Sequence, residues 1–222
     1  MKPTAARTAR SRRVEIAILA GGRSSRMGAD KARLRLGGRT LLAHIRASAR
    51  QSGCPHRVLR RDLIPGRGPL GGVHTALATS RADAVLFLSC DMPFLSARLI
   101  RLLLRRWNGG QAALFVRTDG RAGFPFLVRR ESLPAVERLL DERRDSLQQL
   151  ARALRARLLG LARRWYGDLV NINTRGDWKA ARARWRTMRS PVVARGRRRR
   201  RESAHASRTP GRARTPLRRS RW

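Results

Sequence analysis

The chain has 222 residues, with 52 Lys and Arg against 14 Asp and Glu, which gives a formal net charge of +38. This length allows one domain of about 150–200 residues with an apolar core, together with an appendage. The two cysteines, Cys54 and Cys90, exclude a disulfide framework and a cysteine-based metal site, and no apolar run approaches the roughly 20 residues of a membrane span. We therefore expect a cytoplasmic protein in a reducing compartment.

Arginine supplies nearly all of the positive charge. A field of this sign attracts polyanions such as nucleic acids, anionic lipids and phosphorylated small molecules. The excess has two explanations, which are arginine-rich codon usage throughout the chain or selection for a polyanionic partner. The aromatic content is only 5%, and the sequence has no stacking motif or helix-turn-helix, which argues against a recognised nucleic-acid-binding fold.

Apolar residues recur with strand and helix periods along most of the chain. The run at 14–20 is mostly apolar and ends at two glycines, which is typical of a buried parallel strand. Ser96 fits the N-cap of a helix, and Thr174 with Asp177 fits a capping box. In chain order we expect a strand at 14–20, helices at 40–50 and 69–78, a strand at 84–88, a helix at 96–107, strands at 112–116 and 124–128, helices at 133–140 and 146–154, a strand at 169–172, and a helix from 174 to about 185.

This alternation of strands and helices predicts an α/β protein, specifically a single Rossmann-like three-layer domain with a mostly parallel sheet. Ligands in such folds bind at the carboxyl ends of the strands. The chemistry should therefore lie just after Ala20 and just after Leu88. Residues 1–13 form a basic N-terminal arm, for which a transit peptide is a further interpretation, and residues 14–187 form the domain.

Residues 188–222 form a basic tail without apolar periodicity, including five consecutive arginines from Arg197 to Arg201. The tail contains too few apolar residues to fold alone and holds about a third of the net charge, so we expect it to be disordered. Two interpretations stay open for it. It is either a solvated tail with no specific role or an arm that binds nucleic acid or an acidic partner without sequence specificity.

The most informative segment runs from Leu19 to Lys31. Gly21 and Gly22 let backbone N–H groups approach an anion, and Arg26 and Lys31 add positive charge that suits phosphate groups. The spacing is neither that of a Walker A loop nor that of a dinucleotide-binding fingerprint. Taken alone, the segment predicts a phosphate-binding loop, with a structural turn as the alternative.

Together with three later segments, this stretch carries a family resemblance. The sequence LAGGRSSRMGADKARLRLGG at 19–38 resembles the signature of the molybdenum cofactor guanylyltransferases, and PGRGPLGG at 65–72, CDMPFL at 90–95 and VNINT at 170–174 follow in the family's order. The resemblance covers about residues 14–185. It implies the transfer of GMP from GTP to the terminal phosphate of molybdopterin, with release of pyrophosphate and with Mg²⁺ as the cofactor.

The resemblance also implies roles for individual residues. Guanine and the phosphates are held by the segment Leu19, Ala20, Gly21 and Gly22. Lys31 matches the family's phosphate lysine and is assigned to catalysis together with Arg26 and Asp91.

Asp91 matches the Mg²⁺ ligand, and Asp62 matches an aspartate near the nucleotide. Asn171 and Asn173 match the segment that closes the pterin side. For Asp91 the alternative is a turn or N-cap residue, and for Asp62 a solvated loop carboxylate. His74 falls within a predicted helix and is interpreted as a packed or surface histidine, not as a base.

The implied reaction is an in-line attack of the acceptor phosphate on the α-phosphate of GTP. The acceptor phosphate is largely a dianion near neutral pH, so the reaction needs neither a general base nor a covalent enzyme intermediate. Two anions must approach each other, so positive charge from Lys31, Arg26 and a cation on Asp91 is the main requirement. We expect a monomer that binds GTP and the molybdenum cofactor and that meets other proteins of the cofactor's biosynthesis.

The chain departs from the family between residues 53 and 61. Relatives carry an extra strand–helix unit there, with an asparagine near the nucleotide, whereas this interval has room for one short strand at Val58 and Leu59 or for none. Residues 123–126 also replace a His-Pro type of segment on the acceptor side. The LAGG and GPLGG segments favour guanine, and the alternatives are CTP as donor, another phosphorylated acceptor, an inactive relative, or a polyanion-binding protein that acts through its tail.

Overall fold

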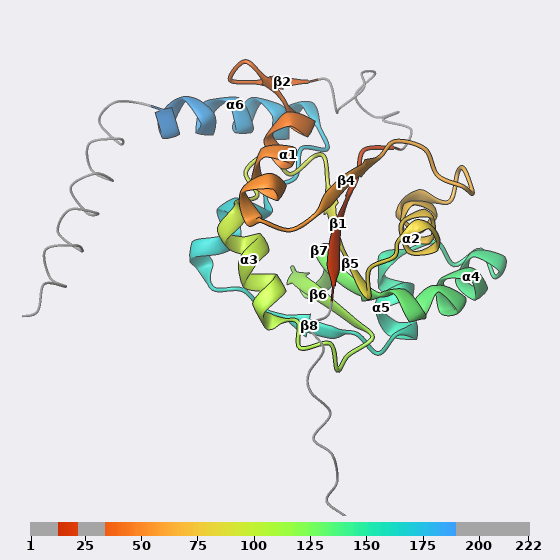
Figure 1. Ribbon diagram of the computed structural model, residues 1–222. Helices are drawn as coiled ribbons and strands as arrows, with labels where there is room; N and C mark the ends of the chain where they lie inside the picture. The colour runs from red at the N-terminus through yellow and green to blue at the C-terminus, as the bar shows by residue number, and fades with distance from the viewer. Residues whose placement is uncertain (1–12, 22–33, 190–222) are drawn as a thin grey trace, which may run out of the picture.

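The computed structural model describes residues 13–21 and 34–189 (Figure 1). The predicted N-terminal arm and basic tail lie almost entirely outside these ranges. In chain order the elements are β1 (Val14–Leu19), β2 (Arg35–Leu36), β3 (Arg39–Thr40), α1 (Leu41–Ser52), β4 (His56–Leu59), α2 (Gly68–Thr79), β5 (Ala84–Ser89), α3 (Ala97–Arg106), β6 (Ala113–Thr118), β7 (Arg121–Arg129), α4 (Leu133–Asp141), α5 (Leu147–Ala153), β8 (Arg157–Leu159) and α6 (Arg175–Arg189), with short 3-10 helices at η2 (Arg130–Ser132) and η3 (Arg163–Leu169).

Six strands form one sheet in the order β4-β1-β5-β7-β6-β8, and β2 with β3 forms a separate antiparallel pair. The strands β4, β1 and β5 run parallel, as do β6 and β8, while β7 is antiparallel to both of its neighbours. The sheet is therefore mostly parallel, and the α/β fold expected from the sequence is confirmed.

Successive residues of the strands face opposite sides of the sheet, and each side has its own core. On β1, Ile16 and Ile18 pack in one cluster with residues of α1 and α3, whereas Ala17 packs in the other cluster with residues of α2, α4 and α5. Figure 1 shows α1 and α3 on one side of the sheet and α2, α4 and α5 on the other. The domain thus has the three layers that the alternating pattern predicts.

The helix boundaries follow from capping groups that the sequence reveals. Ser96 Oγ accepts a hydrogen bond from the backbone N–H of Leu99 at 3.2 Å, as expected for the N-cap of α3. At α6, Thr174 Oγ1 accepts from Asp177 N at 3.0 Å, and Asp177 Oδ2 accepts from Thr174 N at 2.8 Å. This reciprocal pair is the predicted capping box, and α6 continues to Arg189, beyond the expected end.

One predicted strand is wrong. Residues 169–172 were expected to add a strand, but η3 runs through Leu169, and the next residues have no regular structure. Ile172 is fully buried in a small cluster with Leu36, Leu41 and Ala181, beneath α6. Its apolar side chain therefore reflects packing against α6 and the β2–β3 pair, not membership of the sheet.

Between α1 and α2 the chain forms a single strand, β4, which pairs in parallel with β1 so that Val58 lies opposite Ile18. Residues 60–67 contain no helix or strand. Of the two alternatives raised by the shortened interval, the structure has the short replacement strand. It forms one outer edge of the sheet.

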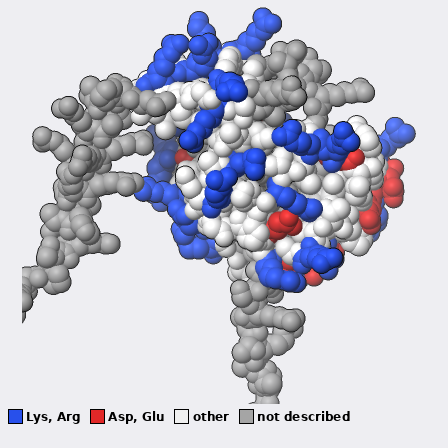
Figure 2. Space-filling view, turned by 45° about the horizontal axis from the view of Figure 1, so that its top comes forward, with Lys and Arg blue, Asp and Glu red and all other residues white. Residues whose placement is uncertain are grey.

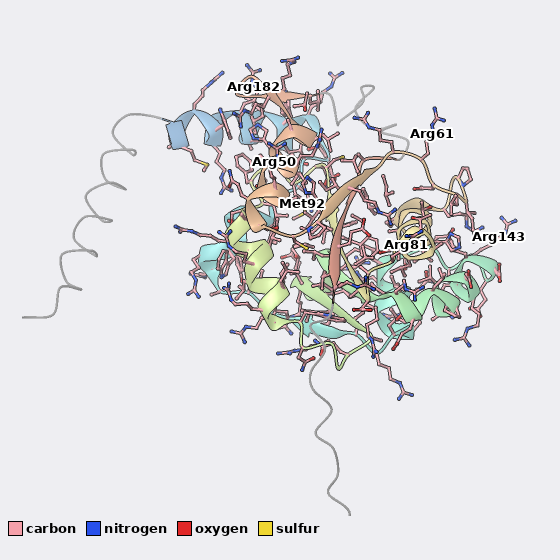
Figure 3. The ribbon with its side chains drawn as sticks, in the orientation of Figure 1. Arg50, Arg61, Arg81, Met92, Arg143 and Arg182 are labelled. Carbon is pink, nitrogen blue, oxygen red and sulfur yellow. The ribbon has the colours of Figure 1, made fainter. Side chains whose placement is uncertain are left out.

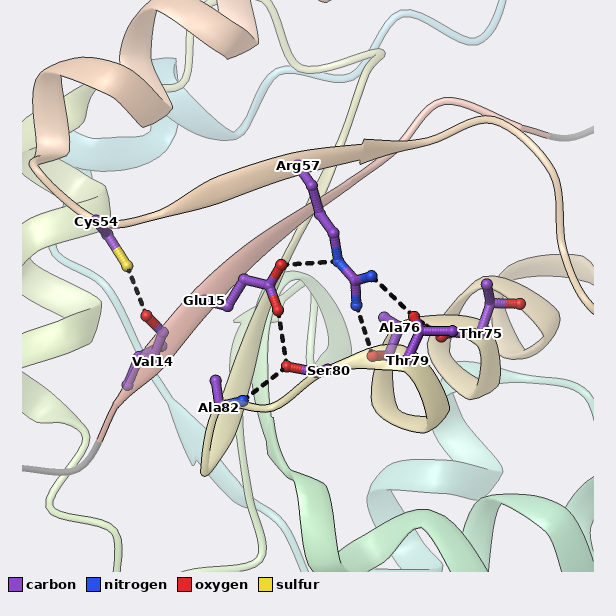
Figure 4. A network of polar contacts seen from close by, with 9 residues as sticks. All are labelled: Val14, Glu15, Cys54, Arg57, Thr75, Ala76, Thr79, Ser80 and Ala82. Carbon is purple, nitrogen blue, oxygen red and sulfur yellow. Dashed lines mark hydrogen bonds and ion pairs between the residues drawn. The ribbon is translucent and has the colours of Figure 1, made fainter.

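A polar network joins β4 to β1 and to the last turn of α2 (Figure 4). Arg57 Nε lies 2.8 Å from Glu15 Oε1. Its two other nitrogens donate to Thr79 Oγ1 and to the carbonyl of Ala76, each at 2.8 Å. Ser80 Oγ donates to the second oxygen of Glu15 at 2.7 Å. A cation at the carboxyl end of a helix is favourable, so Arg57 stabilises both the edge strand and α2.

We expect Arg57→Ala to lower the free energy of unfolding by about 2 kcal/mol, because it leaves the half-buried Glu15 carboxylate without its cation. Urea denaturation measures the change. Arg81→Ala removes an exposed arginine and is the control. If the two variants unfold at the same urea concentration, the network does not stabilise the edge strand.

Cys54 belongs to the same region. Its thiol donates to the carbonyl of Val14 at 3.1 Å. Burial, with a smaller contribution from the nearby charge of Glu15, raises the pKa of the Cys54 thiol to about 11. The thiolate is the reactive form of cysteine, so Cys54 is a packing residue.

The described domain is itself basic. On the face drawn in Figure 2, Lys and Arg side chains are spread over the surface, and Asp and Glu side chains form only small groups. The positive charge of the chain is therefore not confined to the tail. Among the helices that the structure describes, none combines the length and apolarity needed to cross a membrane.

Candidate functional site

Three chain segments meet at the carboxyl end of β1. The backbone N–H of Ala20 donates to the carbonyl of Leu59 at 2.8 Å, and the N–H of Cys90 donates to the carbonyl of Leu19 at 3.2 Å. The residues that follow β1, β4 and β5 are thereby held side by side. This is the sheet edge at which the sequence predicts the chemistry.

Gly21 lies where β1 and β4 come closest. A Cβ on Gly21 would lie 2.9 Å from the carbonyl oxygen of Arg60, closer than Cβ atoms approach other atoms in proteins. The backbone oxygen cannot move aside as a flexible side chain can. Glycine is therefore required at this position by the packing of the two segments, before any ligand is considered.

The LAGG and GPLGG segments touch each other directly. A Cβ on Gly72 would lie 3.1 Å from both methyl groups of Leu19. Leu19 is half-buried and packs in the core cluster on the α2 side of the sheet. The two segments thus pack against each other, and the absence of a side chain at Gly72 makes that contact possible.

A cleft of about 820 Å³ opens next to these two segments. Its walls come from the residues after β1, from the loop after β4 and from the beginning of α2. They are Gly21, Arg60, Arg61, Asp62, Pro65, Gly66 and Gly68. Figure 3 shows Arg61 on the segment that leads from β4 toward α2. The volume lies within the range of small-molecule sites, and the cations and glycines suit an anionic ligand.

Asp62 lies half-buried at the edge of this cleft. A Cβ on Gly71 would lie 3.2 Å from Asp62 Oδ2 and 2.8 Å from the carbonyl of Ile64, so glycine at 71 lets this loop lie against α2. The N–H of Leu63 donates to Thr75 Oγ1 at 2.8 Å and fixes the loop from the other side. Burial raises the pKa of Asp62, because the charged form is poorly hydrated there.

Asp91 is the second residue after β5, and its Oδ1 atom is buried. The backbone carbonyl of Asp91 accepts a hydrogen bond from the N–H of Ile172 at 2.9 Å. This bond places the exposed residues Asn171 and Asn173 beside Asp91, although 80 or more positions separate them in the chain. The structure therefore brings the predicted metal ligand and the predicted pterin-side segment together.

Asp62 and Asp91 do not form a carboxylate pair. They follow β4 and β5, which lie on opposite sides of β1, and two strand spacings correspond to about 10 Å. Within residues 13–21 and 34–189, no three His, Cys, Asp or Glu side chains gather in a way that could hold a metal ion. A single carboxylate fits Mg²⁺ only when substrate phosphates and water supply the other ligands, which is how proteins usually hold this ion.

Three predicted site residues, Gly22, Arg26 and Lys31, lie outside the described residues. The chain is described again from Leu34, which packs on the cluster beneath α6.

Two features near the site were not predicted from the sequence. Asp168 Oδ2 accepts hydrogen bonds from Ser96 N, at 3.0 Å, and from Ser96 Oγ, which fixes the chain just before Asn171 to the start of α3. The sequence offered one clue to this contact, because Asp168 lies two positions before the 170–174 motif. The second feature is Arg67, at the beginning of α2, whose guanidinium contacts Asp145. No local pattern joins two residues so far apart in sequence.

The geometry is that of an α/β fold with a cleft at the carboxyl ends of its strands, and comparison with known proteins decides the family. The family model described as "MobA-like NTP transferase domain" matches residues 16–159, well over half of the chain. The chain belongs to this family. Its fold and family are those of a nucleotidyltransferase.

Individual relatives agree with this assignment. A protein of Syntrophotalea carbinolica named "Molybdenum cofactor guanylyltransferase" is 31% identical over 190 residues, covering 76% of this chain and 89% of that protein. The crystal structure of molybdopterin-guanine dinucleotide biosynthesis protein A from Archaeoglobus fulgidus aligns with a TM-score of 0.64 at 21% identity, covering 78% of this chain and all of that one. Rv0371C of Mycobacterium tuberculosis, solved as a complex with manganese, aligns with a TM-score of 0.54 at 17% identity, covering 77% and 97% of the two chains. At these identities the solved structures establish the fold alone.

Proposed function

We propose that this protein transfers GMP from GTP to molybdopterin, releases pyrophosphate and so forms molybdopterin guanine dinucleotide. The observation that carries the proposal is the close packing of Leu19 against Gly72, next to the 820 Å³ cleft that Gly21 lines. This contact joins the two segments associated with guanine. The name of the Syntrophotalea relative supports the same reaction.

Asp62 gives a physical reason for choosing GTP. Its carboxylate lines the cleft and is poorly hydrated, so N–H donors from a ligand would stabilise its charged form. The Watson–Crick edge of guanine offers adjacent N–H donors, whereas cytosine and adenine place an unprotonated ring nitrogen beside their amino group. An acceptor-only carboxylate repels such a nitrogen and therefore favours guanine.

The phosphates of GTP would extend from the cleft toward Asp91. Asp91 would hold Mg²⁺ together with those phosphates, and the manganese complex of Rv0371C supports a divalent cation in this fold. When bound, Mg²⁺ would offset the charge shared by the α-phosphate and the acceptor phosphate. Arg26 and Lys31, in the segment after Gly22, would stabilise charge on the departing pyrophosphate.

The acceptor would approach from the side of Asn171 and Asn173. Both side chains are exposed, and the hydrogen bond between Ile172 N and Asp91 O sets their place relative to Asp91. The acceptor phosphate carries its own negative charge near neutral pH, so no side chain has to remove a proton. The role proposed for the asparagines is to hydrogen-bond the pterin and orient its phosphate.

The proposal also covers the setting of the enzyme. The chain would act in the cytoplasm as a monomeric domain of residues 14–187, and it would exchange its product with other proteins of molybdenum cofactor biosynthesis. The arm at 1–13 and the tail at 188–222 would contact nucleic acid only through charge, with an affinity that falls steeply as salt is added.

A thermal-shift titration with GTP, CTP and ATP in the presence of Mg²⁺ tests the donor. GTP is expected to stabilise the protein most, by about 2.7 kcal/mol when its concentration is a hundredfold above its dissociation constant. Asp62→Asn should reduce this preference, because an amide also offers N–H groups to cytosine. Equal stabilisation by CTP or ATP would exclude the proposed donor, and the absence of any shift would favour an inactive relative.

A further inference from the structure

The turn that forms one wall of the cleft contains a single side chain between two glycines. Gly66 and Gly68 both line the cleft and both have positive φ, at 78° and 53°. Such glycines are the most flexible residues of a chain, so the backbone alone does not hold this turn in one conformation. Arg67, between them, is the residue whose side chain can hold it.

Arg67 reaches away from the cleft to the corner between α4 and α5. Its Nε donates to Asp145 Oδ1 at 3.1 Å, and its Nη2 lies 3.0 Å from the same oxygen. Nη2 also donates to the carbonyl of Leu140. Leu140 lies in the last turn of α4, where a cation is favourable, and its carbonyl also accepts a hydrogen bond from Arg143 N at 3.1 Å.

Burial makes these contacts stronger than ordinary surface pairs. The side chains of Arg67 and Asp145 are 19% and 33% exposed. The corner also lies directly against the turn, since a Cβ on Gly68 would be 4.0 Å from the carbonyl of Asp145. The same corner holds a second ion pair, Arg144 with Glu142 at 3.0 Å, which is about half exposed. Figure 3 shows the neighbouring Arg143 extending outward from the end of α4.

We infer that Arg67 is a positioning residue for the nucleotide. It holds the turn at 65–68 and the start of α2 in the conformation that binds the nucleotide, before the nucleotide arrives. Without the link, the two glycines would sample many conformations, and part of the binding free energy would be used to order them. The inference rests on the proposed function in that the cleft takes a nucleotide, whereas the anchoring of the turn does not depend on it.

The test compares Arg67→Ala, Asp145→Ala and the double variant with Arg144→Ala as the matched control. Hydrogen–deuterium exchange at the amides of Gly66, Arg67 and Gly68 reports on the turn without any ligand. Both single variants are expected to exchange faster there and to raise the KM for the nucleotide about tenfold, with kcat little changed. The double variant should be no worse than the singles, because both remove one link. Arg67→Lys should restore binding only in part, since a point charge cannot make the same set of hydrogen bonds.

The outcomes separate this inference from the proposed function. If wild type binds GTP but Arg67→Ala alters exchange and KM no more than Arg144→Ala does, the inference is wrong and the proposed function stands. If Arg67→Ala lowers only the melting temperature, the pair is merely structural. If wild type prefers CTP, the proposed donor is wrong, and the same variants then test Arg67 with CTP. If none of the three nucleotides binds, both proposals fail.

Discussion

Asp91→Asn is expected to lower kcat about a hundredfold or more while leaving the fold intact, because the change keeps the side chain's shape and removes its charge. Asp91 lies two residues after the buried strand β5, and the hydrogen bond from Ile172 N to its backbone carbonyl does not depend on the carboxylate. Steady-state kinetics with GTP and molybdopterin at saturating Mg²⁺ measures the change, and circular dichroism verifies folding.

Asp141→Asn, at the exposed end of α4, is the matched control and should keep wild-type turnover. The loss in Asp91→Asn should lessen as Mg²⁺ is raised if the carboxylate serves mainly to bind the ion. An Asp91→Asn enzyme with near wild-type turnover would remove Asp91 from the site and leave it as a turn residue.

Lys31→Ala is the second change for which we expect a large effect, a fall in kcat of about a hundredfold with a smaller change in GTP affinity. The charge on pyrophosphate appears as the bond to the α-phosphate breaks, and interactions that strengthen in the transition state raise turnover more than binding. Lys31→Arg should rescue poorly, because a planar guanidinium does not replace a compact ammonium. Single-turnover kinetics separates the two effects.

Lys179→Ala is the control for the loss of one cation, since Lys179 is exposed on α6. If Lys31→Ala retains its turnover and loses only GTP affinity, Lys31 binds the phosphates without a role in catalysis. Arg26 then becomes the stronger candidate for stabilising pyrophosphate.

The sequence predicts the central strands of the fold well and the peripheral ones poorly. The strand at β5 is a continuous apolar run, which is typical of a strand covered on both faces, and the structure buries it on both faces. Strand β8 has three residues and begins with the exposed Arg157, so it is too short to show a detectable alternation of apolar and polar residues. The mistaken strand at 169–172 has the opposite cause, because Ile172 is buried by α6, a contact that local periodicity does not record.

The residues of the candidate site also divide into those that the sequence predicts and those that it does not. The place of Asp91 follows from the rule that ligands bind where parallel strands end, and that rule needs only the strand that precedes it. The sequence left Asp62 between a nucleotide-binding residue and a solvated carboxylate, and the structure places it half-buried against Gly71. The link between Arg67 and Asp145 spans 78 positions, and its partners are set by the packing of α2 on α4. A contact between residues so far apart in the sequence depends on the whole fold and does not show in a local pattern.

The two outer strands, β4 and β8, also bear on how the protein behaves at high concentration. An outer strand offers unpaired backbone groups to which a second sheet can add, and long, flat, uncharged edges are the most hazardous. Here the edges are four and three residues long, and arginines lie beside them, with Arg60 and Arg61 after β4 and Arg157 within β8. Two copies would also repel each other through a formal charge of +38 each. The fold thus resists strand-to-strand aggregation, even though Leu158 on β8 is exposed.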